Sequence, residues 1–514
     1  MKIRSNMRIL LVAIFATLAM VSCISETSVP NDERERISLK AWIELNRPEL
    51  LNNYQEEGGY YVEILDERPI ENESASGNDF GTEPLLEQDT CWVYTNMTGR
   101  DINGAICMTR SGELAEMCGT FSYSTHYVPY INFCSDTNVG LLEGTHLSMR
   151  HELTLSDEFC TWYKEKYGKE IEQPYKMRKG SKVRLYLPST IAFGESGSSM
   201  EGGYEGQFSL DASRPLIMDI EVLGAIKNPS DKELEMVTSY IVDDDDWTQA
   251  VKPESEKTDE NDDLRLKGLY YKFDFNPKSD EVELYKYMQP HLLGANNPYK
   301  DTKKYVDIKK LNREINEILL NRFGEGLTSK ERTEKTEVTK DGRANVWYVL
   351  RFLDGFVVDT NIAEIRTLVF GESAPECEAF SYSPSDDEGK GEVERSAIGA
   401  WYYCIPKMHH GAYGQIITTS GYAYGSAGVS GTTTTTESTT GGSYYNPYGY
   451  YNYYNYYNSY YGSYGNPYYD YYNYYNYYNY EYDAGETVTT TTIGTEILPY
   501  TPLVFTIFVD PKEE

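Results

Sequence analysis

Two stretches near the C-terminal end contain the residue types best suited to bind and orient a ligand. They are Ala397–Gly425, with the sequence AIGAWYYCIPKMHHGAYGQIITTSGYAYG, and Ile497–Val509, with the sequence ILPYTPLVFTIFV. Both are rich in bulky apolar and tyrosine side chains, which can wall a pocket and keep a few polar tips to orient a ligand. The chemistry that suits such a set is the recognition and orientation of a bound group.

The sequence lacks the motifs of several other kinds of chemistry. It contains no Gly-x-Ser-x-Gly motif, P-loop, dinucleotide fingerprint or Cys-x-x-Cys pair. A metal ion needs several converging ligands, and no such set accompanies His146, His151 or the pair His409-His410. We therefore expect no metal and no cofactor, and we expect these histidines to be solvated.

The elements that must position the two stretches follow from their apolar patterns. Around Ile398 and Trp401 the chain reads as a short apolar turn of helix, and Gly411 marks a reversal into a strand. A closing strand is indicated by the alternation of Leu503, Phe505 and Ile507.

Upstream elements complete this second half. The range 345–352 is predicted as a strand, Leu353-Asp354-Gly355 as a turn and the range 356–360 as a second strand. Asp307–Phe323 has apolar residues at helical spacing, which is typical of core packing.

The first half repeats this order in a weaker form. Strands are predicted at 59–65, 91–98, 183–188 and 216–222, with a short helix starting in Leu141–Gly144. The opening GYYVEI at 59–64 matches GLYYKF at 268–273, which places the start of a second domain near Leu264. An amphipathic helix capped by Ser38 is expected at 38–55.

These patterns divide the chain into successive parts. We expect a signal segment at 1–23, a tether at 24–37, a first domain at 38–227, an exposed acidic linker at 228–263 and a second domain at 264–514. A segment rich in Tyr, Asn and Thr, 426–496, interrupts the second domain. Such a composition lacks the apolar periodicity of a packed core, so it is either a disordered loop or an adhesive surface.

The N-terminus has the pattern of an export signal. Lys2, Arg4 and Arg8 precede the apolar run Ile9–Val21, which is too short to span a bilayer comfortably. The run ends in Val-Ser-Cys, which looks like a bacterial lipobox with Cys23 as the lipidated residue. The alternative is an ordinary cleaved signal peptide in which this cysteine has no role.

The net charge bears on the possible partners of the protein, and the cysteine content bears on disulfide formation. The formal net charge of -33 argues against nucleic acid as a partner, because phosphates need Lys and Arg. Of the eight cysteines, lipidation of Cys23 leaves seven, an odd number that cannot all pair. Disulfides are possible in an exported protein, but connectivity cannot be deduced from spacing, and buried free thiols are the simpler expectation.

With the interruption removed, the second half resembles the FKBP-type peptidyl-prolyl isomerases. The resemblance rests on an Asp-Gly turn, the apolar-Asp pair Val358-Asp359, a short helix carrying Ile398 and Trp401 where the family has a Gly-Trp helix start, Met-x-x-Gly, Ala-Tyr-Gly, Ile-x-Pro and Leu-x-Phe. It implies an α+β fold of two FKBP-like domains, each an antiparallel half-barrel sheet wrapped on a short helix, with the low-complexity loop inserted in the second.

The resemblance also implies residue roles in the second domain. Tyr348, Asp359 and Tyr424 stand at the catalytic positions, with Tyr424 as a hydroxyl donor on the loop that overhangs the pocket. The pocket itself would be lined by Val358, Ile398, Trp401, Ile497 and Phe505, with Trp401 as its floor. The family's usual phenylalanine before the aspartate is replaced by Val358, and Phe370 is a candidate for a further pocket aromatic.

The first domain departs further from the family pattern. At the corresponding positions stand Met97, Cys107-Met108, Thr145, Phe193 and Met218. This copy is therefore expected to keep the fold with little or no isomerase activity, as a peptide-binding pocket or a spacer.

Two functions remain open on the sequence. The first is a lipid-anchored prolyl isomerase or folding factor of a bacterial envelope, acting on proline-containing polypeptides without a cofactor. The second is a non-catalytic surface or periplasmic binding lipoprotein that uses the tyrosine-rich loop for adhesion. Residues Asp359, Trp401 and Tyr424 favour the first, and the altered first domain and the long insertion favour the second.

Overall fold

The computed structural model describes most of the chain outside its low-complexity parts. The described residues are 31–66, 74–119, 125–138, 141–194, 197–199, 209–257, 263–273, 275–278, 303–339, 342–370, 377–382, 398–429 and 495–512. Cys23 and the bulk of the tyrosine-rich insertion lie outside them. Among these residues no helix has the length and apolar content needed to cross a membrane.

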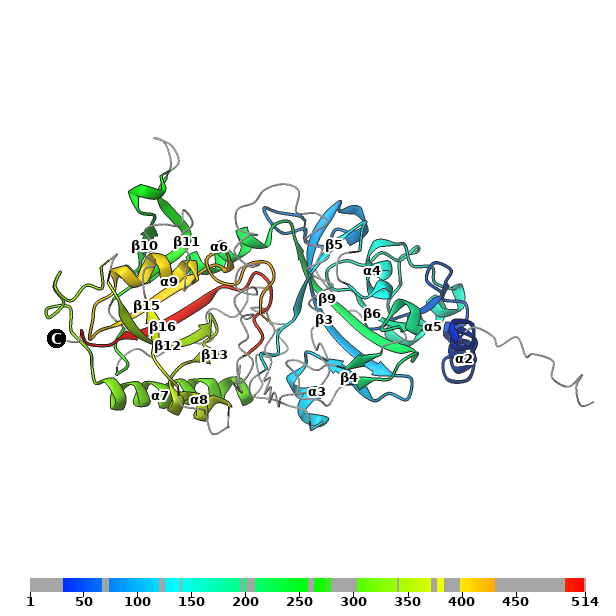
Figure 1. The fold of residues 1–514 in the computed structure, drawn as a ribbon. Coiled ribbons are helices and arrows are strands. Elements are labelled where there is room, and N and C mark those ends of the chain that lie inside the picture. Colours follow the sequence, from blue (N-terminus) through cyan, green and yellow to red (C-terminus); the bar gives the residue numbers. More distant parts are fainter. Residues whose placement is uncertain are drawn as a thin grey trace, which may run out of the picture.

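Two seven-stranded antiparallel sheets, with helices packed on them, give the protein an α+β fold (Figure 1). The first sheet runs in the order β1 (Tyr54–Gln55), β2 (Tyr60–Ile64), β6 (Lys182–Leu187), β9 (Leu216–Ile226), β3 (Thr90–Asp101) and β4 (Ile106–Thr109), with β5 (Tyr130–Ser135) also paired to β3. The second runs in the order β10 (Thr248–Val251), β11 (Arg265–Lys272), β15 (Tyr413–Thr418), β16 (Leu503–Val509), β12 (Ala344–Phe352) and β13 (Val357–Thr360), with β14 (Phe380–Tyr382) paired to β12. A small separate pair joins β7 (Ser198–Ser199) to β8 (Ser209–Leu210).

The two sheets are copies of one topology. Strand for strand, the order of the first sheet reappears in the second, including the seventh strand on the same neighbour. We call the parts built on them the first unit and the second unit. The strand register confirms the predicted match between residues 59–64 and 268–273. Val62 pairs with Leu185 and Tyr271 pairs with Ile416. Val62 and Tyr271 each lie three residues after a glycine.

That glycine is required by the backbone in both units. Gly59 and Gly268 have φ angles of +69° and +82°, a region that residues with a Cβ rarely adopt. A Cβ on Gly268 would also lie 2.5 Å from Cγ2 of Thr419. The glycine therefore stands at an equivalent point of both sheets, directly before β2 and inside β11, for a steric reason that the sequence repeat preserves.

Helices flank each sheet. In the first unit they are α2 (Asn31–Asn46), α3 (Gly112–Met117), α4 (Glu143–Arg150) and α5 (Asp157–Tyr167). In the second unit they are α6 (Pro229–Ile241), α7 (Lys303–Phe323), α8 (Ala363–Phe370) and α9 (Gly399–Cys404). Short 3₁₀ turns complete the set, including η1 (Pro48–Leu50), η3 (Ser189–Ile191) and η7 (Ser420–Tyr422).

Strand β16 is buried on both faces. Phe505 on one face belongs to the same core cluster as Trp401 of α9, whereas Phe508 on the other face packs with Ile315 of α7 and Ile365 of α8. Figure 1 shows α7 and α8 lying along one side of the second sheet. The apolar residues predicted at alternate positions form one buried face of this strand. Its other face is buried too, because helices cover both sides of the sheet.

The acidic segment expected to be an exposed linker is folded instead. Residues 229–241 form α6, capped by Asn228, and residues 248–251 form the edge strand β10. Glu233, Met236 and Val237 are buried at helical spacing on one face of α6. The prediction of a linker was wrong because acidic residues such as Asp231 and Glu235 lie on the solvent side of an amphipathic helix, while Glu233 is buried with the apolar residues.

The predicted helix at 38–55 is also displaced. Helix α2 begins at Asn31 and ends at Asn46, so it takes in residues assigned to the tether. Ser38 is therefore no cap but lies inside the helix, where its Oγ donates to the carbonyl of Arg34 at 2.8 Å. After Asn46 the chain turns into η1, whose first residue is Pro48, a residue that favours the first turn of a new helix over the interior of a long one.

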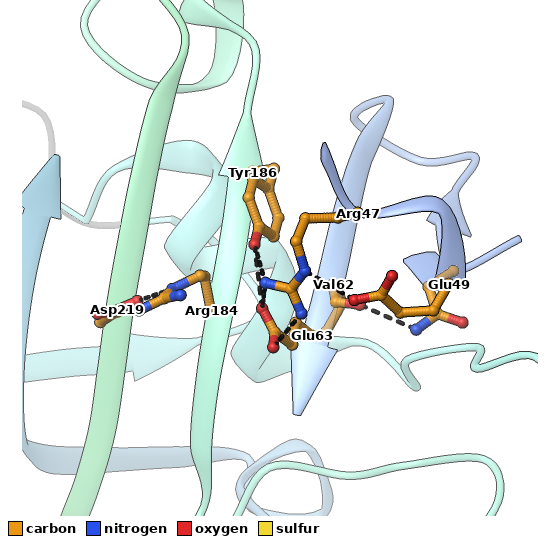
Figure 2. A network of polar contacts seen from close by, with 8 residues as sticks. Arg47, Glu49, Val62, Glu63, Arg184, Tyr186 and Asp219 are labelled. Carbon is orange, nitrogen blue, oxygen red and sulfur yellow. Dashed lines mark hydrogen bonds and ion pairs between the residues drawn. The ribbon is translucent and has the colours of Figure 1, made fainter. Parts of the chain in front are cut away.

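An ionic network ties the end of α2 to the first sheet (Figure 2). Arg47 donates to both carboxylate oxygens of Glu63 on β2, at 2.6 and 2.5 Å, and to the hydroxyl of Tyr186 on β6 at 2.9 Å. One strand further, Arg184 on β6 holds Asp219 on β9 in a two-bond pair, at 2.5 and 2.9 Å. Paired charges of this kind tolerate partial burial because each retains its hydrogen bonds.

The burial of α6 gives a test of the corrected boundary. We expect Val237→Asp, which places a charge at a fully buried position, to lower the free energy of unfolding by about 3 kcal/mol or more. Val242→Asp, at a valine that is 67% exposed just beyond α6, should change it by less than about 0.5 kcal/mol. Chemical denaturation of the two variants measures the difference, and equal small effects would restore the linker interpretation.

Candidate functional site

The residues singled out in the second half of the sequence lie together on one face of the second sheet. Those that are buried in a common apolar cluster are Val358, Trp401, Ile497 and Phe505. Those that are partly buried and pack against it are Tyr348, Ile398 and Tyr424. Together with Phe380, introduced below, we call this set the Trp401 cluster.

Each member is delivered by a different element. Tyr348 comes from β12, Val358 from β13 and Phe505 from β16. Trp401 stands in the first turn of α9, whose capping position is Ile398. The site therefore exists only when the sheet and α9 are assembled, since no two neighbouring elements of the chain contain it.

Edge-to-face aromatic contacts organise the cluster around the indole ring. The ring of Trp401 meets Tyr348 at 5.3 Å and 77°, Phe505 at 5.7 Å and 75°, and Phe380 at 4.8 Å and 86°. This geometry sets the positive edge of one ring against the negative face of another, and each such pair adds about 0.5–1.5 kcal/mol beyond its buried area. The indole is thus held rigidly from three sides.

Phe370, the candidate for a further aromatic in this group, does not lie beside Trp401, whereas Phe380 does. Phe370 ends α8 and packs with the cluster on the opposite face of the sheet. Phe380 lies on β14, where it pairs with Val346 and packs against Trp401. The sequence could not distinguish them, because the short strand β14 contains no apolar alternation long enough to be recognised.

A polar network lies beside the aromatic rings. The hydroxyl of Tyr348 donates to Oδ2 of Asp359 at 2.6 Å, and Nη2 of Arg366 donates to Oδ1 of the same carboxylate at 3.1 Å. Arg366 was missed by the sequence analysis. Its position seven residues after Asp359, on α8, brings its guanidinium back to that carboxylate.

Burial governs the protonation of this network. It raises the pKa of Asp359 above its usual range, although the hydrogen bond from Tyr348 and the charge of Arg366 act in the opposite direction. Burial, followed by the nearby carboxylate of Asp359, raises the pKa of Tyr348 well above its usual value. Tyr348 therefore remains a neutral hydrogen-bond donor whose orientation is set by Asp359.

The indole nitrogen of Trp401 is a buried donor. Within the described part of the chain, Nε1 has no hydrogen-bond acceptor, and the residue is 5% exposed. Buried indole N–H groups usually have a partner. The indole N–H is therefore a buried donor that the described residues leave without a partner.

The tyrosine-rich insertion leaves and returns at the edge of the site. Val429 and Ile497 exchange two backbone hydrogen bonds, each 2.8 Å long. The returning chain is also bonded to the hairpin of the site, since the N–H of Thr495 donates to the carbonyl of Val358 at 3.0 Å. The described ends of the insertion therefore form a closed neck beside Tyr424 and Ile497.

A carboxylate from α6 holds the turn that leads to Tyr424. The backbone N–H and the hydroxyl of Ser420 donate to the two oxygens of Glu233, each at 2.7 Å. The first unit repeats this arrangement with Ser189 and Glu35, at 2.5 Å for both bonds. The sequence contains a sign of this repeat, because Ser189 lies four residues before Phe193 and Ser420 lies four residues before Tyr424.

The equivalent site of the first unit is filled with flexible apolar side chains. Met97 and Met108 are 8% exposed and Met218 is fully buried. In the strand register, Met108 pairs with Gly99 and Asp359 pairs with Leu350, at equivalent positions of the two sheets. The thioether of Met108 therefore takes the place of the carboxylate of Asp359. The substitutions found in the sequence therefore remove the polar network from this copy.

The first unit contacts the loops of the second unit's site. The ring of His126 stacks on Phe352 at 4.4 Å and its Nε2 lies 2.7 Å from Oδ2 of Asp354, in the Asp-Gly turn of the site hairpin. Arg110 pairs with Glu496, the residue before Ile497, at 2.7 Å. Burial alone would raise the pKa of Asp354, but the interaction with His126, together with hydrogen bonds from backbone N–H groups such as that of Phe356, lowers that pKa.

Comparison with known proteins leaves the family of this chain open. No protein-family model and no curated protein matches it. Among solved structures, the three FKBP domains of wheat FKBP73 cover 89% of this chain and 95% of their own, at 12% identity and a TM-score of 0.18. AtFKBP13 covers 33% of this chain and 94% of its own, at 14% identity and a TM-score of 0.20.

A further match is FkpA from Escherichia coli. It covers 43% of this chain and 72% of its own, at 13% identity and a TM-score of 0.21. Overlaps of this quality carry no argument about function. The case for a function must therefore be made from the residues of the site.

The Glu233–Ser420 contact predicts a dependence of stability on pH. Burial raises the pKa of Glu233 from 4.5 to about 7. A carboxyl with a raised pKa in the folded state stabilises the fold fully below its unfolded pKa, and this contribution is lost as the pH rises through the folded pKa. Between about pH 4.5 and pH 8, we expect Glu233→Gln to gain about 3 kcal/mol in free energy of unfolding relative to the unsubstituted protein.

Denaturant titrations across this pH range measure that gain. Glu235→Gln is the matched control on the same helix, since the Glu235 side chain is 60% exposed. The account of Glu233 would be contradicted by two parallel pH profiles for Glu233→Gln and the unsubstituted protein.

Proposed function

We propose that the second unit is a peptidyl-prolyl cis-trans isomerase of the FKBP type, and that the protein is a folding factor of a bacterial envelope. The observation that carries the proposal is the Trp401 cluster with the Tyr348–Asp359–Arg366 network beside it. Residues separated by more than 150 positions converge there on an aromatic floor with polar groups at its side. The proposed substrates are proline-containing polypeptides, with no cofactor.

The chemistry asked of such a site is modest. Rotation about an X-Pro bond breaks amide resonance at a barrier of about 18–20 kcal/mol, and the catalyst must bind the twisted amide more tightly than either planar isomer. A twisted amide is less dipolar than a planar one, so an apolar aromatic pocket favours it. In this proposal Trp401 is the floor that contacts the proline ring, with Phe505 and Phe380 as walls.

Polar groups have supporting roles in the same proposal. Asp359 and Arg366 hold the Tyr348 ring in place through the 2.6 Å and 3.1 Å bonds. Tyr424, held by the turn that Glu233 anchors, supplies a hydroxyl to the substrate carbonyl. Val358 provides an aliphatic wall where the resembled family has an aromatic one, so we expect slower catalysis than an aromatic wall would support.

Catalysis is tested by cis/trans exchange on a series of X-Pro tetrapeptides with the chain from residue 24. We expect acceleration over buffer, and we expect the double variant Asp359→Ala, Tyr424→Phe to reduce it about tenfold or more, because both the ordered wall and the donor are lost. Phe193→Leu, at the position of the first unit equivalent to Tyr424, is the control and should leave the rate unchanged.

Folding of each variant must be verified by far-UV circular dichroism before rates are compared. If the double variant is unfolded, Tyr424→Phe alone serves, since Tyr424 is only partly buried. Absence of acceleration for every peptide would reject the isomerase.

Membrane attachment through Cys23 is the second part of the proposal. It is supported by the charged, apolar and Val-Ser-Cys segments that precede the folded part. A diacylated cysteine would anchor the chain stably, because two or more acyl chains are needed for lasting attachment.

Anchoring predicts a clear change in fractionation. In a bacterial host that processes lipoproteins, the unsubstituted chain should sediment with membranes and incorporate a labelled fatty acid. Cys23→Ser should do neither, whereas Cys118→Ser, at an exposed cysteine of the first unit, should behave as the unsubstituted chain does. Equal labelling of all three would exclude lipidation at Cys23.

A binding protein without catalysis is the second candidate. It is favoured by the neck at Val429 and Ile497, which places the ends of the tyrosine-rich insertion at the edge of the Trp401 cluster. In that case the insertion serves as an adhesive surface. The peptide experiment separates the two candidates, since adhesion alone accelerates no exchange.

A further inference from the structure

Two cysteines of the first unit face each other across a pair of strands. Cys91 on β3 and Cys134 on β5 are direct partners in the antiparallel register. Directly opposed residues in such a ladder have Cα atoms about 4.5–5.5 Å apart, and disulfides span Cα distances of about 4.4–6.8 Å. The backbone therefore already holds the two cysteines at bonding separation.

The side chains meet in a closed environment. Both residues are fully buried, in one apolar cluster. Each thiol is the hydrogen-bonding partner of the other, so their sulfur atoms are in contact. Both are thiols in the structure.

Register selects this pair from the cysteines of the described residues. Cys118 is exposed and Cys160 accepts a hydrogen bond from Gln173. Cys107 lies on β4, which pairs with a part of β3 that contains no cysteine, and Cys377 and Cys404 belong to the second unit. No cysteine occurs on β12 or β14, the strands of the second unit that correspond to β3 and β5. The opposed pair is thus particular to the first unit.

We propose that Cys91 and Cys134 form a disulfide when the chain folds under oxidising conditions, with a small-molecule or protein disulfide as the oxidant. One of the two cysteines, as a thiolate, attacks one sulfur of the oxidant and releases its other sulfur as a thiolate. The other cysteine then gives up its proton to solvent, attacks the Sγ of the first and releases the second thiolate. Two cysteine thiols lose two electrons and two protons in total, and the oxidant is reduced to two thiols.

In the paired structure the two thiols differ in acidity. The hydrogen bond from Cys91 lowers the pKa of the Cys134 thiol, and the charge of Arg150 adds to this against the effect of burial. The hydrogen bond to Cys134, followed by burial, raises the pKa of Cys91. Because both sulfurs are inaccessible once β5 is paired, the exchange takes place before the strand closes on β3.

The bond would fix a segment that reaches the second unit. Residues between the two cysteines include β4, α3, Arg110 and His126. Arg110 and His126 contact Glu496 and Asp354 at the loops of the Trp401 cluster. The disulfide would join the two ends of this segment, where β3 and β5 pair in the first sheet.

The test is peptide mapping of the chain from residue 24, refolded in a buffer of oxidised and reduced glutathione. Free thiols are alkylated before digestion without reductant. We expect one cross-linked peptide pair containing Cys91 and Cys134, absent from Cys91→Ser. Recovery of both cysteines in alkylated form, or a cross-link of either one to another cysteine, would overturn the proposal. Neither result depends on whether the protein is exported or catalytic.

Stability provides a second measurement. A disulfide that closes a loop of this length raises the midpoint temperature of thermal unfolding. Reductant should therefore lower this midpoint for the oxidised chain by about 5–10 °C. The double variant Cys91→Ser, Cys134→Ser should show no such response, and the control Cys118→Ser should keep it. A response of equal size in the double variant would show that another bond is responsible and would refute this pairing.

Discussion

Seven consecutive residue pairs join β12 to β16, and the site of the second unit depends on this ladder. Strand β16 lies between β15 and β12, so the last folded strand of the chain occupies the centre of its sheet. The pairing of Leu350 with Phe505 brings that ring onto the face where Tyr348 and Trp401 meet. A slip of one residue would turn Phe505 to the other face and dismantle the cluster.

The two units show how one topology can hold different interiors. The sheets agree strand for strand, and in both a glutamate from the preceding helix binds a serine at the start of an equivalent turn. The site positions differ, because Met108 replaces Asp359 and Thr145 replaces Trp401. Packing that preserves a fold does not preserve the polar groups of a site, so the function of each unit must be argued from its own residues.

Contact between the units concentrates on the edge of the second unit's site. His126 and Arg110 of the first unit hold the hairpin turn at Asp354 and the chain at Glu496, which continues directly into Ile497. His126, Asp354 and Arg110 are nearly buried, whereas the Glu496 side chain is 33% exposed. Bonds to charged groups are stronger where solvent is excluded. The altered first unit thereby acts as a support for the loops on which the proposed substrate pocket depends.

Local sequence patterns predicted the main strands and the short helix around the Trp401 cluster. Apolar periodicity and turn residues placed the strands around Tyr348 and Phe505 and the helix at Trp401, because these patterns depend only on neighbours along the chain. Only tertiary contacts show that the acidic segment after Asn228 is folded, that Phe380 packs on Trp401 and that Arg366 binds Asp359. Those assignments depend on which faces meet across the sheet, and strand register, set by contacts far apart in the chain, is not encoded in local spacing.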